Sequence, residues 1–245
     1  LFQHVIQAKK PVVLVLNNGR PASIPDLIEK SNAVLEAWIP GEEGGNAVAK
    51  VLFGDVNPGG KLPVSIPRSV GQLPVFYNYK SSGRHSNIYG NYVNEEVTPL
   101  FAFGHGLSYT TFEYSDLTIN PNNVNAGKVV DISLKVKNTG KRSGDEVVQL
   151  YIRDEFASFP RPVKELKGFI RLPLSARETK HVIFHLPIDQ LAYYDHDLRL
   201  ILEPGKFHVM VGSSSDDIRL DGEFTIGGDI VEIKKRVFVC PVEIR

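Results

Sequence analysis

Residues 130–137, Val130-Asp-Ile-Ser-Leu-Lys-Val-Lys137, alternate apolar and polar side chains at every position. This period of two is typical of a β-strand with one buried and one solvated face. The same pattern recurs further along the chain, at Val148–Ile152, Val182–Leu186, Phe207–Val211 and Leu220–Ile226. Roughly seven short strands with turn residues between them predict an antiparallel β-sandwich over residues 113–228.

The numbers of cysteine and tryptophan residues indicate the type of sandwich. The chain has one cysteine, Cys240, and one tryptophan, Trp38, so the Cys–Trp–Cys pattern of antibody domains cannot occur. The pattern therefore favours a fibronectin type III-like, immunoglobulin-like sandwich. Residues 229–245 extend past its last expected strand, and their basic triplet, Lys234–Arg236, is interpreted as a solvated face.

The N-terminal part has a different organisation. Two apolar runs, Val12–Leu16 and Ala33–Trp38, alternate with helical patterns at Leu1–Ile6, at Ile24–Lys30 and after Asn46. Such runs are typical of strands buried on both faces of an α/β sheet. Asn46 is expected to cap the third helix, and Gly54 to end it.

This α/β segment, residues 1–67, is too short for a complete doubly wound domain. A helix that leads into a parallel strand also requires an earlier strand for that strand to pair with. We therefore expect the chain to be one part of a longer protein, with an incomplete α/β sandwich followed by the all-β sandwich. Between them, residues 68–112 are rich in glycine and proline and are expected to form a linker that wraps the domains.

Composition excludes several classes of partner. Formal net charge is zero, so no overall field attracts nucleic acid or an anionic membrane surface. No apolar run approaches the length of a membrane-spanning helix. The single Cys240 cannot form an internal disulfide, which fits a reducing compartment and an exported protein without disulfides alike.

Four motifs carry a family resemblance. They are Ala37-Trp-Ile-Pro-Gly-Glu-Glu-Gly-Gly-Asn46, Val51-Leu-Phe-Gly-Asp-Val-Asn-Pro-Gly-Gly-Lys-Leu-Pro63, Phe103-Gly-His-Gly-Leu-Ser-Tyr-Thr-Thr-Phe112 and Arg161-Pro-Val-Lys-Glu-Leu-Lys-Gly-Phe169. In this order they resemble the C-terminal part of a family 3 glycoside hydrolase of the bacterial β-glucosidase or β-xylosidase type. The resemblance covers the chain up to about residue 228.

The resemblance implies a retaining hydrolase with a TIM-like barrel, an α/β sandwich and a fibronectin III-like domain, and it implies no cofactor. Such enzymes use two carboxylates across the scissile bond. The nucleophilic Asp and the acid/base Glu are both expected upstream of Leu1, so we assign no catalytic residue to this chain. Its expected partners are a β-linked oligosaccharide or aryl glycoside and the N-terminal barrel part of the same protein, with a homodimer left open.

Glu42 and Glu43 are the one pair of carboxylates that invites a catalytic interpretation. They follow an apolar strand, where ligand sites form in α/β folds. Adjacent residues in a turn point apart, however, and cannot flank one glycosidic bond. We therefore interpret them as charges that complement the dipole of the following helix. Arg20 similarly follows a strand, and a structural role is favoured for it.

The loop Ser81–Tyr92 is the best candidate for substrate contact. Arg84 and His85 offer hydrogen-bond donors, and Tyr89 offers an aromatic face for the apolar side of a sugar ring. The competing interpretation is packing between domains, and the loop has Asn87-Ile88 where an aromatic residue would strengthen the prediction.

A metal site is not favoured. The chain has seven histidines, but their spacing with Cys, Asp and Glu matches no closed set of ligands. His181 and His185 are expected on the outer face of one strand, too far apart for one site, and Asp195-His196-Asp197 is expected to be a turn. The rival to the glycosidase hypothesis is a binding or interaction module, without catalysis, built on the fibronectin III-like sandwich.

Overall fold

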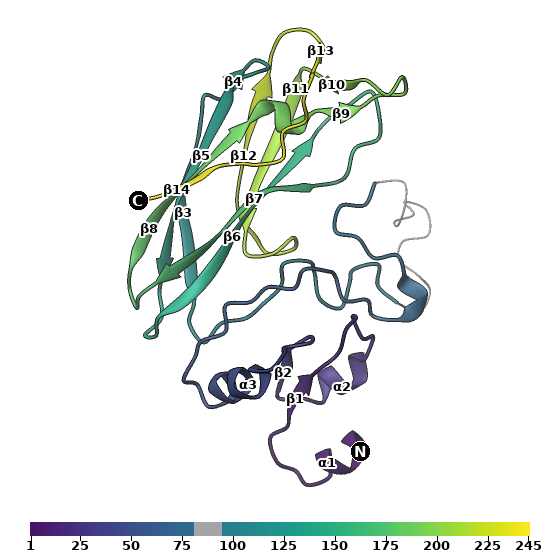
Figure 1. Ribbon diagram of the computed structural model, residues 1–245, viewed down its shortest axis with the longest axis vertical. Coiled ribbons are helices and arrows are strands. Elements are labelled where there is room, and N and C mark those ends of the chain that lie inside the picture. Colours follow the sequence, from purple (N-terminus) through teal and green to yellow (C-terminus); the bar gives the residue numbers. More distant parts are fainter. Residues whose placement is uncertain (81–94) are drawn as a thin grey trace.

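The computed structural model describes residues 1–80 and 95–245. Figure 1 shows a small α/β part at the N-terminal end, a linker across the middle and a β-sandwich beyond it. Within the described residues, no helix is both long enough and apolar enough to cross a membrane.

The N-terminal part alternates helix and strand as the sequence predicts. Its elements are α1 (Phe2–Ile6), β1 (Val13–Leu16), α2 (Pro25–Glu29), β2 (Ala33–Glu36) and α3 (Gly44–Leu52). β1 and β2 pair in parallel, with Val13 opposite Ala33. The strands are not buried on both faces, however, because Val13 and Val15 are 47% and 37% exposed. No residue before Gly44 is buried, so this part has no core of its own.

The start of α3 corrects one expectation. The helix begins at Gly44 with Glu43 at its N-cap, so Asn46 lies inside the first turn. The side-chain amide of Asn46 donates instead to Glu43 Oε2 at 2.7 Å. Gly54 follows the last helical residues with φ +82°, a conformation that glycine adopts without strain, and it ends the helix as predicted.

From here on, the linker denotes the whole chain between α3 and β3, residues 53–111, and its described residues fold back on themselves beside the sandwich. Ile66 and Phe101 form an isolated antiparallel bridge, and the 3-10 turn η1 (Val70–Gln72) lies between these two positions in the chain. The buried Gln72 side chain donates to the carbonyl of Thr98 at 2.9 Å and to that of Glu96 at 3.1 Å. These hydrogen bonds fix the two arms of the linker against each other.

The sandwich consists of two main sheets and a small third one. A five-stranded sheet has the order β4-β12-β11-β6-β7, a four-stranded sheet has the order β14-β8-β5-β3, and the short β13, β10 and β9 form a three-stranded sheet at one end (Figure 1). The bounds are β3 (Phe112–Asn120), β4 (Asn123–Val124), β5 (Val129–Asn138), β6 (Gly144–Asp154), β7 (Glu165–Leu174), β8 (Thr179–Pro187), η2 (Ile188–Leu191), β9 (Tyr193–Tyr194), β10 (Leu200–Leu202), β11 (Gly205–Gly212), β12 (Ile218–Ile226), β13 (Val231–Glu232) and β14 (Val242–Ile244). The predicted fold class, α/β followed by an all-β sandwich, is confirmed.

The core of the sandwich comes from the alternation that the sequence shows. Val130, Ile132, Leu134 and Val136 on β5 are all fully buried and belong to one apolar cluster with side chains of β6, β8 and β11. Each such side chain contributes about 1.5–3 kcal/mol when it leaves water. β6, which supplies part of this cluster, also borders the linker.

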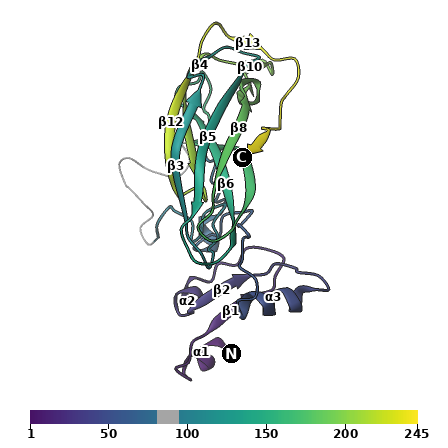
Figure 2. The same cartoon turned by 90° about the vertical axis from the view of Figure 1, so that its left-hand side faces the viewer.

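The C-terminal residues are part of the sandwich. β13 pairs with β10, and β14 pairs with β8, with Val242 opposite Phe184. Between them Cys240 is buried within the apolar cluster, and Gln190 Nε2 donates to the carbonyl of Phe238 at 3.2 Å. Figure 2 shows this segment running from β13 to β14 beside β8. The sequence pattern predicts no role for it, because three paired residues carry too little alternation to indicate a strand.

Candidate functional site

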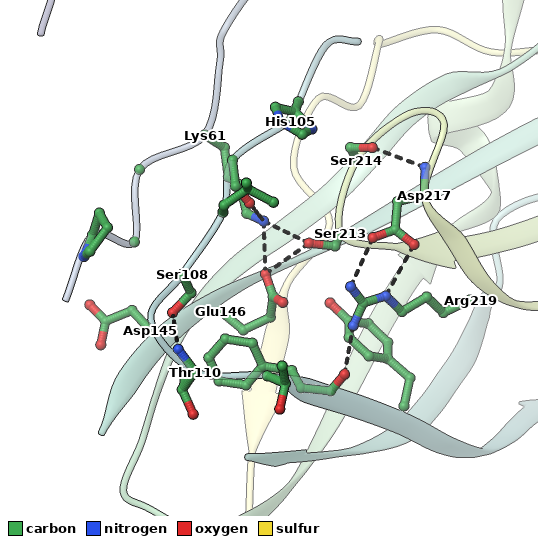
Figure 3. Close-up of a pocket in the computed structure, with 18 of the residues that line it drawn as sticks. Lys61, His105, Ser108, Thr110, Asp145, Glu146, Ser213, Ser214, Asp217 and Arg219 are labelled. Atoms are coloured by element: carbon green, nitrogen blue, oxygen red, sulfur yellow. Dashed lines mark hydrogen bonds and ion pairs between the residues drawn. The ribbon is translucent and has the colours of Figure 1, made fainter. Parts of the chain in front are cut away.

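A pocket of about 520 Å³ lies where the linker meets the sandwich (Figure 3). Its linker side comes from residues 58–61, 105–108, 110 and 111. Its sandwich side comes from the starts of β3 and β6, from the turn between β11 and β12, and from Arg219 on β12. The family motifs that end at Pro63 and Phe112 therefore meet here, although they are far apart in the sequence.

Lys61 is the centre of the polar contacts in this pocket. Its Nζ lies 3.1 Å from Glu146 Oε1 and donates to Ser213 Oγ at 2.6 Å and to the carbonyl of Gly106 at 3.0 Å. Ser213 in turn donates to Glu146 Oε1 at 3.1 Å. Glu146 is 2% exposed, and a buried carboxylate is tolerated only when paired and hydrogen-bonded. Lys61 thus ties the linker to β6.

A second set of contacts surrounds Tyr114 on β3. Arg219 lies over the Tyr114 ring, 4.9 Å from its centroid, and donates to the carbonyl of Phe112 at 2.7 Å. Its guanidinium also pairs with Asp217 at 2.8 Å, and the hydrogen bond from Arg219 lowers the pKa of that carboxyl. Burial, followed by the nearby Glu146 carboxylate, raises the pKa of Tyr114 well above its usual value. The hydroxyl is therefore neutral, and it has no hydrogen-bond partner among the described residues.

Two glycines of the Phe103–Phe112 motif are required by close backbone approach. Gly104 has φ +81°, and a Cβ there would overlap the side-chain amide of Gln149. A Cβ on Gly106 would overlap the carbonyl oxygen of Gly60. A side chain at position 106 would therefore force the two linker arms apart, and one at position 104 would displace the Gln149 amide from its place between the linker and β6.

Gln149 completes the junction, and sequence reasoning missed it. It is buried on the outer face of β6, where it donates to the carbonyl of Ser213 at 2.6 Å and accepts from the Tyr151 hydroxyl at 2.6 Å. Alternation along β6 predicts a solvated side chain at this position. The linker covers that face instead, which no local pattern reveals.

The junction is built as a clamp rather than a reactive centre. Ser213 is 4% exposed, and its hydroxyl already lies between Lys61 and Glu146. His105 stacks on Phe101 at 5.1 Å, and its pKa is lowered by burial and then by the Lys61 charge, so it is neutral at pH 7. The polar side chains at the centre of the pocket are thus buried and already hydrogen-bonded to one another, which is the arrangement of a structural contact.

The predicted substrate-contact residues Arg84, His85 and Tyr89 lie outside the described residues, so that prediction stays a prediction. Glu42 and Glu43 are exposed in the turn before α3, and neither lines the pocket in Figure 3. The position of Glu43 at the N-cap fits the helix-dipole interpretation.

The remaining candidates lie on the surface. Among residues 1–80 and 95–245, no group of three His, Cys, Asp or Glu side chains is arranged to hold a metal ion. His185 is on the outer face of β8, and its Nδ1 lies 2.7 Å from Asp131 Oδ1. The turn at Asp195-His196-Asp197 is confirmed, since Asp195 Oδ1 accepts from the backbone N–H of Asp197 and of Arg199, each at 2.9 Å.

Comparison with known families identifies both parts of the chain. Residues 1–109 match the glycosyl hydrolase family 3 C-terminal domain, and residues 146–215 match the fibronectin type III-like domain. Residues 1–109 carry the C-terminal domain of glycoside hydrolase family 3. The chain matches the C-terminal part of that family, as the four motifs implied.

Individual family 3 relatives match over most of the chain. The periplasmic β-glucosidase of Salmonella typhimurium is 45% identical over 223 residues, and a β-xylosidase of Formosa agariphila is 47% identical over 225 residues. Each match spans 89% of this chain and only 29% or 30% of the relative. The crystal structure of a β-glucosidase from Listeria innocua in complex with glucose superimposes with a TM-score of 0.88 at 39% identity, over 94% of this chain and 33% of that one. The chain thus spans about a third of the length of its family 3 relatives.

Proposed function

We propose that this chain is the C-terminal portion of a retaining β-glycosidase that removes non-reducing-end β-glucosyl or β-xylosyl units. In this proposal the two catalytic carboxylates are contributed by the part of the enzyme that the chain does not span. The chain itself braces the catalytic domains. Relatives named β-glucosidase and β-xylosidase that extend over three times its length support this division of labour.

The observation that carries the bracing role is the exposed α/β part. A two-stranded parallel sheet is not stable alone, because both of its faces and both of its edges are open. Here no residue before Gly44 is buried, and apolar side chains such as Val13 and Ile39 face solvent. A further protein layer is therefore required to complete this sheet.

The junction supplies the second half of the role. Lys61, Glu146 and Ser213 hold the linker against the sandwich through buried polar contacts. Since the linker leads directly from the α/β part, this clamp fixes the sandwich relative to that part. Arg84, His85 and Tyr89, which lie outside the described residues, are proposed to contact the substrate.

The test is activity with and without the rest of the enzyme. The purified chain should not hydrolyse nitrophenyl β-glucoside or β-xyloside, whereas the complete protein expressed from its gene should hydrolyse at least one of them. Turnover by the chain alone that disappears in Glu43→Gln would overturn the assignment of the acid/base upstream. Arg84→Ala or Tyr89→Ala in the complete protein should raise KM or change the preference between the two substrates.

The rival hypothesis, a binding module, has a direct test of its own. A titration of the chain against xylan and cellulose should show no saturable binding, because the outer face of β5 presents Asp131, Lys135 and Lys137 rather than a row of aromatic rings. Saturable affinity for either polymer would favour the binding module over the brace.

A further inference from the structure

A second hollow, separate from the junction, lies on the linker. It has a volume of about 530 Å³ and runs between residues 63–65 and residues 73–78, with Phe103 also in its wall. We refer to it as the linker groove. All ten residues that line it are uncharged, and most are apolar. Depletion of charge is the compositional mark of the buried centre of an interface.

The rim of the linker groove exposes large apolar side chains. Phe76 is 61% exposed, Leu73 is 56% exposed and Val64 is 40% exposed. Single exposed apolar residues are ordinary on a protein surface, but a contiguous group around a hollow marks an interaction site. The groove is therefore a surface that another body is expected to cover.

The groove is preformed by contacts beneath it. The rings of Tyr77 and Phe103 stack at 4.4 Å, and Tyr77 meets the edge of Tyr151 on β6 at 5.8 Å. Next to it, Val163 donates from its backbone N–H to the carbonyl of Tyr79 at 3.0 Å. A partner that binds here finds a rigid wall and loses little entropy in ordering it.

We propose that the linker groove is the docking site for an apolar segment of the catalytic part of the same polypeptide. The length of the relatives favours this occupant, since about two-thirds of each relative lies outside the match to this chain. The α/β part that leads into the linker also lacks a covering layer, and one body that covered both surfaces would bury them together. This inference rests on the proposed function and adds to it the surface through which the chain holds the catalytic part.

Thiol accessibility in the complete protein tests this directly. Phe76→Cys places a thiol on the rim, and Phe156→Cys places one on a matched, exposed phenylalanine site. Phe156, which is 80% exposed, follows the far end of β6, whose first residue is at the linker. Cys240 adds little background, because burial raises its pKa to about 12 and keeps it unreactive.

Labelling with a maleimide, mapped by mass spectrometry, gives the result. The thiol of Phe76→Cys should react at least tenfold more slowly in the complete protein than in the chain alone, whereas the thiol of Phe156→Cys should react at similar rates in both. Equal labelling of Phe76→Cys in the two proteins would overturn the proposal and leave the proposed function intact. Protection of this rim thiol in the chain alone, accompanied by a dimer in light scattering, would identify a second copy as the occupant and would likewise overturn it.

A charge variant and an activity assay distinguish failure of the docking proposal from failure of the proposed function. Phe76→Glu should lower the thermal midpoint of the complete protein and leave that of the chain alone unchanged, because the side chain is exposed in the chain alone. If the complete protein has the same thermal midpoint with and without Phe76→Glu, docking at the groove is contradicted. Absence of β-glycosidase activity in the unmodified complete protein would instead reject the proposed function.

Discussion

At the scale of single residues, the contact that matters most is the buried pair of Lys61 and Glu146. Their side chains are 13% and 3% exposed, so each charge depends on the other for its stability. Buried pairs of this kind are weak evidence for stability but are costly to break, because the remaining charge stays desolvated. The pair therefore fixes the position of the linker more than it adds net free energy.

Removing one partner should expose this dependence. Lys61→Ala is expected to lower the free energy of unfolding by about 3–5 kcal/mol, the cost of an uncompensated buried charge. The double substitution Lys61→Met with Glu146→Leu should recover most of that loss. Arg171→Ala is the control, since Arg171 is 64% exposed in its pair with Asp145 and such pairs contribute about 0–1 kcal/mol. Urea unfolding of the three variants measures these changes in the free energy of unfolding. An equal loss for Lys61→Ala and Arg171→Ala would contradict a structural role for the buried Lys61–Glu146 pair.

Asp154, at the end of β6, gives a prediction of pH dependence. Burial raises its pKa to about 6, against the opposing effect of the Arg161 charge. Because the folded carboxyl binds a proton more readily than the unfolded one, this group contributes more stability as pH falls from 7 through 6 towards the unfolded pKa near 4. Asp154→Asn should therefore raise the thermal midpoint at pH 7.5, and the difference from the unmodified protein should shrink at pH 4.5. A pH-independent effect of Asp154→Asn would contradict the raised pKa.

At the scale of elements, the C-terminal segment closes one side of the sandwich. Without β14, β8 would be an edge strand with unpaired backbone groups, and such edges promote association between molecules. Cys240 lies beside Gly168 of β7, where a Cβ added to the glycine would be 3.3 Å from its sulfur. The segment therefore contacts β7 at the edge of one main sheet and, through β14, forms the edge strand of the other.

Truncation after Val239 tests this closure. Loss of Cys240 from the core and of the β14–β8 pairing should lower the free energy of unfolding by about 2 kcal/mol or more, as for other losses of buried side chains. Light scattering should also show new self-association through the β8 edge. Val239→Ser changes only an exposed residue, 69% accessible, and should stay within about 0.5 kcal/mol. A truncated chain with unchanged stability and mass would show that the segment is dispensable.

At the scale of the whole molecule, stability is unevenly distributed. The sandwich has a core of fully buried residues on β5, β6, β8 and β11, whereas residues 1–43 have none. Cooperative protection from hydrogen exchange follows such differences in burial. The chain should therefore unfold in two stages, with the α/β part first.

Hydrogen exchange on the chain and on the complete protein measures this. Amides of β5 and β6 should exchange with a free energy of opening of at least about 5 kcal/mol, the scale of global stability, in both the chain alone and the complete protein. Amides of β1 and β2 should exchange rapidly in the chain alone and become protected in the complete protein, where the missing layer is expected to cover them. Equal protection of β1 in the two proteins would contradict the bracing role.

The sequence alone determined the class of each part and the family. Alternation in segments such as Val130–Lys137 sets which face of a strand is apolar, and four contiguous motifs are enough to indicate a family, because both kinds of information are local.

The tertiary structure alone decided what those motifs do. The junction brings Glu146 and Gln149 together with Lys61 and Ser213, which are 152 positions apart in the sequence. The face of β6 that carries Gln149 is buried only because the linker covers it. Pairing of β14 with β8 likewise depends on a strand edge that forms only when the sheet is assembled. Burial of a polar residue depends on which distant segment lies over it, and that is a property of the folded chain rather than of any stretch of its sequence.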